Sequence, residues 1–73
     1  MTSDIKLLDV VALLDDVPES HLRKGEVGTV VEEFEDEIVE VEFADKRGVA
    51  YAFVDLPKSK LLQLHTVEVA EAE

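Results

Sequence analysis

An acidic loop is the part of this sequence best suited to bind another molecule. Asp15, Asp16 and Glu19 fall within five residues, interrupted by Pro18 and followed by His21. Carboxylates this close together can hold a divalent cation or attract the Lys and Arg side chains of a protein. Their spacing matches no known cation loop and lacks the glycine of sharp calcium loops. We therefore expect a solvated acidic loop that docks a basic partner.

The sequence offers little for catalysis. It has no cysteine, and its three serines and two histidines have no catalytic motif around them. A catalytic group needs a pocket and a neighbour that tunes its pKa, and a chain of 73 residues has little interior in which to form one. We expect no enzyme activity, no cofactor and no bound metal.

The charge of the chain favours a basic partner over nucleic acid. Eighteen acidic residues against seven Lys and Arg give a net charge of −11, which repels nucleic acid and anionic membrane surfaces. The same acidity also keeps a small protein soluble. Basic side chains cluster at predicted loops, and under the alternative hypothesis of nucleic-acid binding they would contact phosphates: Arg23, Lys24, Lys58 and Lys60.

The hydrophobic pattern predicts an all-β domain. Short runs rich in β-branched residues are bounded by charged or turn-forming residues, which is typical of strands. A loop broken by Pro18 separates the first two strands, and the segment 56–60 forms a 3₁₀ turn before the last strand. Five short strands without a long helix favour a small barrel over an α/β fold. The strands are expected at 8–14, 26–34, 38–43, after the turn at 45–48 as far as 56, and at 61–64.

The third strand has the clearest alternation. Val39, Val41 and Phe43 share one face, and Glu40 and Glu42 share the other. This period of two predicts a half-buried strand whose glutamates face solvent. Glu40 and Glu42 therefore join the acidic loop as candidate partner-binding residues.

The second strand leaves two alternatives open, because the turn at 35–37 has no glycine or proline to fix its length. One turn length buries Val31, and the next buries Val30 and Phe34. The sequence alone does not choose between them.

The turn at 45–48 is more informative. Asp45 at its first position and Gly48 at its fourth favour a type I turn closed by a glycine bulge. In that geometry Phe43 opposes Tyr51, and both Tyr51 and Phe53 join the core. The small residues between them then face outward: Ala50, Ala52 and Val54.

Gly25 and Gly28 mark a bend where the acidic loop enters the second strand. Glycine accepts backbone angles and close approaches that a Cβ atom forbids. The stretch Lys24-Gly25-Glu26-Val27-Gly28-Thr29-Val30 resembles the second half of the KOW motif, Lys-Gly-x-x-Gly-x-Val, of SH3-like modules in ribosomal proteins and transcription elongation factors. The resemblance implies an SH3-like barrel. Modules of that kind that bind RNA are basic around their loops, whereas this loop is acidic.

The wider pattern resembles a family of small bacterial proteins of unknown function that has an SH3-like barrel. The likeness spans roughly residues 7–64 and includes Asp-Val-Val-Ala-Leu at 9–13, Gly-Thr-Val-Val-Glu at 28–32 and Glu-Val-Glu-Phe at 40–43. It implies a fold and a stand-alone domain, with no activity attached.

These observations predict an SH3-like barrel over residues 1–65 and a flexible acidic tail over 66–73, in the bacterial cytoplasm. We expect a non-enzymatic protein-interaction module whose basic partner is a neighbour such as an operon-encoded toxin. Two alternatives remain open. One is a KOW-type nucleic-acid-binding module, and the other is a homo-oligomer joined through an edge strand or the C-terminal segment.

Overall fold

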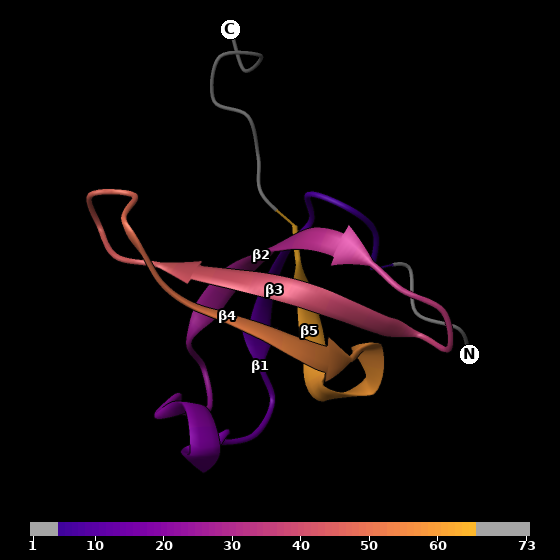
Figure 1. The fold of residues 1–73 in the computed structure, drawn as a ribbon, viewed down its shortest axis with the longest axis horizontal. Coiled ribbons are helices and arrows are strands. Elements are labelled where there is room, and N and C mark those ends of the chain that lie inside the picture. Colours follow the sequence, from indigo (N-terminus) through magenta and orange to yellow (C-terminus); the bar gives the residue numbers. More distant parts are fainter. Residues whose placement is uncertain (1–4, 66–73) are drawn as a thin grey trace, which may run out of the picture.

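The computed structural model describes residues 5–65, which form one antiparallel sheet of five strands (Figure 1). The order across the sheet is β4-β3-β2-β1-β5, so β4 and β5 are its edges. A 3₁₀ turn precedes the last strand, and the predicted all-β fold of five strands is confirmed. The predicted tail, 66–73, lies outside the described residues. The elements are β1 Val10–Leu13, η1 Pro18–Ser20, β2 Val27–Glu33, β3 Ile38–Ala44, β4 Ala50–Pro57, η2 Lys58–Lys60 and β5 Leu61–Leu64.

The core lies against one face of this sheet. Val39, Val41 and Phe43 on β3 are fully buried, as their alternation predicted. Leu22, which reaches in from the acidic loop, is only 2% exposed, so it plugs the core. The other buried residues are Ile5, Val11, Leu13, Val30, Leu56 and Leu61.

Neither of the two burial patterns predicted for β2 is found in full, because β2 contains a bulge. The pairing of β2 with β3 shifts between Val30 and Glu32, which leaves Val31 as the extra residue. A bulge moves the following residues to the opposite face of a sheet. Val30 lies before the bulge and is buried, whereas Phe34 lies after it and is 46% exposed.

The predicted burial of Tyr51 and Phe53 is wrong. The turn itself forms as expected, since Gly48 has φ +83° and the Asp45 N–H donates to the Val49 carbonyl at 2.9 Å. The pairing of β3 with β4 then shifts beyond Ala44, and Tyr51 becomes an extra residue in β4. Tyr51 and Phe53 consequently face outward, 54% and 58% exposed.

The small residues of β4 take the inward places instead. Ala52 lies opposite Phe43 and Val54 lies opposite Val41, and both side chains pack against the core. Their predicted outward orientation is therefore wrong as well. Phe43 also lies opposite Gly28 on its other side, so the one buried aromatic ring sits between the smallest residues of its two neighbouring strands.

Candidate functional site

The acidic loop between β1 and β2 is a folded hairpin. Val17 and Leu22 exchange two backbone hydrogen bonds of 2.9 and 3.1 Å, and η1 begins at Pro18 between them. His21 closes that turn in the left-handed region, where its N–H donates to the Pro18 carbonyl. Because Leu22 is anchored in the core, the backbone of the loop is tied to the rest of the domain.

This loop and the end of β4 border a groove with a volume of about 360 Å³. Leu13 and Leu56, both buried, give it apolar lining next to Val17 and Pro57. We call it the acidic groove, because four carboxylates and one ammonium group complete its lining: Asp15, Asp16, Glu19, Asp55 and Lys60.

The charges in the acidic groove remain largely uncompensated. Lys60 Nζ lies 3.4 Å from Asp15 Oδ2, and both side chains are more than half exposed. Such an exposed pair contributes little to stability and separates easily. Asp16 Oδ1 accepts the Lys24 backbone N–H at 2.8 Å, which fixes the side of the loop that its carboxylate faces. Among residues 5–65 no ion pair reaches the carboxylates of Glu19 and Asp55.

A row of three carboxylates crosses the sheet and continues the negative charge of the groove. Glu32 on β2 lies opposite Glu40 on β3, and Glu40 lies opposite Asp55 on β4. Like charges directly opposite each other in a sheet are destabilising. We call these residues the acidic row. Asp55, near the end of β4, belongs to both the acidic row and the acidic groove, so the two surfaces are continuous.

Of the five residues predicted to bind a partner, three from the loop line the acidic groove and Glu40 lies in the acidic row. Glu42 is placed differently, because it lies opposite Phe53. Its carboxylate therefore adjoins an exposed aromatic side chain.

Tyr51 of β4 contacts Glu26, which lies between the acidic loop and β2. Its hydroxyl donates to Glu26 Oε1 at 2.7 Å, and the backbone N–H of Arg23 donates to Glu26 Oε2 at 2.8 Å. The hydrogen bond from Tyr51 and that from Arg23 lower the pKa of Glu26. The bond to Glu26 raises the pKa of Tyr51.

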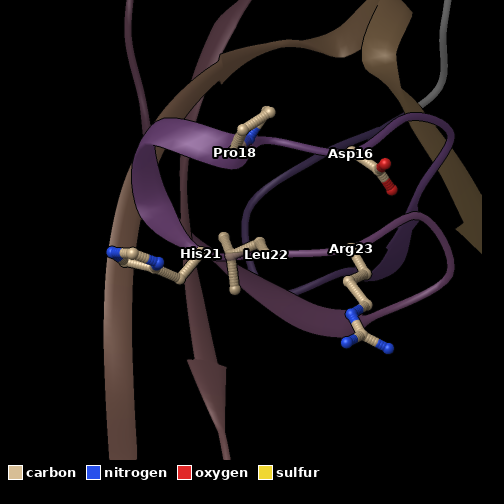
Figure 2. Close-up of a pocket in the computed structure, with 5 residues that line it drawn as sticks. All are labelled: Asp16, Pro18, His21, Leu22 and Arg23. Atoms are coloured by element: carbon tan, nitrogen blue, oxygen red, sulfur yellow. The ribbon is translucent and has the colours of Figure 1, made fainter.

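Two of the four cations of the alternative nucleic-acid hypothesis, Arg23 and Lys60, line two different hollows that share Asp16. Lys60 lies in the acidic groove beside Asp15. Arg23 lines a different hollow, of about 380 Å³, together with Asp16 and His21. Figure 2 shows the His21 ring pointing away from Asp16 and Arg23 on the other side of this hollow.

Two negative findings hold for residues 5–65. No group of three or more His, Cys, Asp or Glu side chains is arranged to hold a metal ion. No helix in this range is long and apolar enough to cross a membrane.

A domain of unknown function, DUF4926, matches residues 7–63 of the sequence. The chain belongs to this family. No curated protein and no solved structure matches it. The DUF4926 region runs from before β1 into β5, so it contains every residue of the acidic groove and the acidic row.

Within the DUF4926 region, sequence reasoning missed four surface residues: Glu32, Tyr51, Phe53 and Asp55. The alternation of Tyr51, Phe53 and Asp55 along one strand was visible. Its face could be assigned only once the bulge at Tyr51 was known, because that bulge reverses which residues point outward.

Proposed function

We propose that this domain is a non-enzymatic protein-interaction module that docks a basic partner protein in its acidic groove. The observation that carries the proposal is the convergence of two segments far apart in the sequence. The loop at 15–19 and Asp55 of β4 place four carboxylates around apolar side chains, and Lys60 is the one cation in the lining. A groove of this composition fits a surface with both Lys or Arg and aliphatic side chains.

The fold and the overall charge support this proposal. The strand order and the 3₁₀ turn before the last strand agree with an SH3-like barrel, a scaffold on which loops form recognition surfaces. The net charge of −11 speeds encounter with a basic protein. A toxin encoded by a neighbouring gene in the cytoplasm is one partner of this kind.

The test compares two variants that remove the same number of charges. The groove variant carries Asp15→Asn, Glu19→Gln and Asp55→Asn, which keep the shape of each side chain. The control variant carries Glu35→Gln, Asp36→Asn and Glu37→Gln in the exposed turn between β2 and β3. Each tagged protein is used to capture partners from a native lysate at low and at high salt, and captured proteins are identified by mass spectrometry.

The proposal expects a captured basic protein that the control variant retains and the groove variant loses. Its capture should also fall at high salt, because the Debye length shrinks to about 3 Å at 1 M. Equal capture by both variants would show that only the net charge matters. That result, or the absence of any partner at low salt, would overturn the proposal.

A further inference from the structure

The outer edge of β4 is the longest unpaired backbone segment of the sheet. β4 spans eight residues, the most of any strand, and pairs only with β3. Among the described residues no other backbone segment is hydrogen-bonded to residues 50–57. The N–H and C=O groups that point away from β3 are therefore open to another strand.

Most of this edge carries none of the devices that normally block strand addition. Natural proteins protect exposed edges with charged side chains, above all Lys, and with Pro, bulges or very short strands. In β4 the bulge residue Tyr51 and Pro57 stand at the two ends. The segment 52–56 between them has neither Lys nor Pro, and its one charged side chain, Asp55, disfavours acidic strands but not basic ones. It offers five consecutive residues for pairing.

The two faces of β4 define the chemistry of the strand that would fit. Ala52 and Val54 face the core and are partly buried, so a neighbouring strand would place aliphatic side chains beside them. Phe53 and Asp55 face outward and are exposed. Phe53 lies opposite Glu42, which adds a carboxylate beside its ring. Aromatic faces and carboxylates together attract Arg and Lys.

We propose that the basic partner binds as an extended strand added to the outer edge of β4, with Arg or Lys alternating with aliphatic residues. This inference rests on the proposed function for the charge of the partner, and adds the mode of binding. The end of β4 also lines the acidic groove through Asp55 and Leu56, so such a strand would run directly into it. A second copy of this chain fits poorly, since each copy carries a net charge of −11 and the two would repel each other.

The test uses a short, end-blocked peptide in which arginine alternates with valine, and measures its binding by fluorescence anisotropy at physiological salt. A peptide of the same composition with all arginines in one block is the control for charge alone. Two further peptides are N-methylated, one at every arginine and the other at every valine. In a strand, alternate N–H groups point to the same edge, so only one of these two peptides loses its hydrogen bonds to β4.

The proposal expects the alternating peptide to bind more tightly than the block peptide. It also expects one N-methylated peptide to bind about tenfold or more weakly, while the other binds as before. The peptide should also slow amide hydrogen exchange in residues 52–56. Equal effects of the two N-methylated peptides, or unchanged exchange in β4, would overturn strand addition. A dimer of the free protein with protected β4 amides would overturn it as well.

Failure of strand addition and failure of the proposed function can be told apart. If the groove variant loses the peptide but N-methylation has no effect, the acidic groove binds the partner and strand addition is wrong. If N-methylation at one set of residues abolishes binding and a variant that changes only the loop, Asp15→Asn with Glu19→Gln, binds the peptide normally, strand addition is right and the acidic groove does not bind the partner. The control variant in the turn at 35–37 should bind the peptide in every case.

Discussion

Replacing Gly28 with alanine tests the packing on which the whole sheet depends. Gly28 has no positive φ, so its need for glycine comes from close contacts rather than from backbone conformation. A Cβ atom there would lie 2.6 Å from Val41 Cγ1, 2.7 Å from the Glu42 carbonyl oxygen and 3.0 Å from Phe43 Cδ2. Val41 is fully buried and β-branched, so its side chain cannot easily rotate away from the added atom. The carbonyl oxygen belongs to the β2–β3 ladder, and moving it shifts the sheet.

The expected loss of stability follows from these contacts. Adding a methyl group to a well-packed core destabilises a protein by about 1–3 kcal/mol. Because one of the clashing atoms belongs to the backbone, we expect Gly28→Ala to fall in the upper part of that range, at about 2–3 kcal/mol. A domain of this size loses roughly 4–8 °C of melting temperature per kcal/mol. We therefore expect a fall of about 8–24 °C. A single core this small rarely supplies more than about 3–5 kcal/mol, so the variant would lose a large part of the total.

Thermal unfolding followed by circular dichroism measures this loss. Gly25→Ala is the matched control, because Gly25 has φ +93° and no atom within 4 Å of an added Cβ. Its cost is backbone strain alone, about 1–2 kcal/mol. The double variant Gly28→Ala with Val41→Ala removes one of the clashing atoms, and should be less destabilised than the two single losses added together. An unchanged melting temperature for Gly28→Ala, or strict additivity with Val41→Ala, would refute this account of the packing.

Two further predictions concern the aromatic residues of β3 and β4. Phe53→Ser should change stability by less than about 0.5 kcal/mol, which urea unfolding measures. Phe43→Ala should lose about 3–5 kcal/mol, enough to unfold most of a domain this small, which circular dichroism without denaturant detects. Similar effects of the two substitutions would mean that the β4 register is wrong. Tyr51→Phe should remove a pH-dependent contribution to stability. Because the pKa of Glu26 lies below its ordinary value of 4.5 in the folded state, the contribution of its bond with Tyr51 is present above that value and lost as the pH falls through the folded pKa. Because the pKa of Tyr51 lies above its ordinary value of 10.0, the contribution is present below that value and lost as the pH rises through the folded pKa. The difference in melting temperature between wild type and Tyr51→Phe should therefore be largest near neutral pH and shrink at both extremes, and a difference that is constant with pH would contradict this assignment.

Local sequence signals predicted those parts of the fold that local chemistry determines. The alternation around Val41 placed β3 correctly, and Asp45 with Gly48 gave the turn that follows it. The short run after η2 gave β5 with its observed ends at Leu61 and Leu64. In each case the pattern lies within a few residues and does not depend on what the segment packs against.

The two bulges could not be predicted in the same way. The extra residues are Val31 and Tyr51, both good strand formers, and neither bulge is marked by a glycine. Each bulge depends on which register fits the partner strand, and that is a property of the whole core. The consequence for the candidate site was large, since the bulge at Tyr51 moved Phe53 and Asp55 to the outward face.

The size of the core explains why this register is preferred. A regular pairing after the turn would have placed Tyr51 opposite Phe43 and Phe53 opposite Val41, adding two aromatic rings to an interior that already holds one. A small domain has no volume for them, and a buried Tyr hydroxyl would also need a partner inside. The bulge instead places Ala52 opposite Phe43 on one side, while Gly28 lies opposite Phe43 on the other. The same small residues that let one ring fill the core therefore send Tyr51, Phe53 and Asp55 to the surface. The exposed aromatic and acidic face of β4 is thus a direct consequence of how the core is packed.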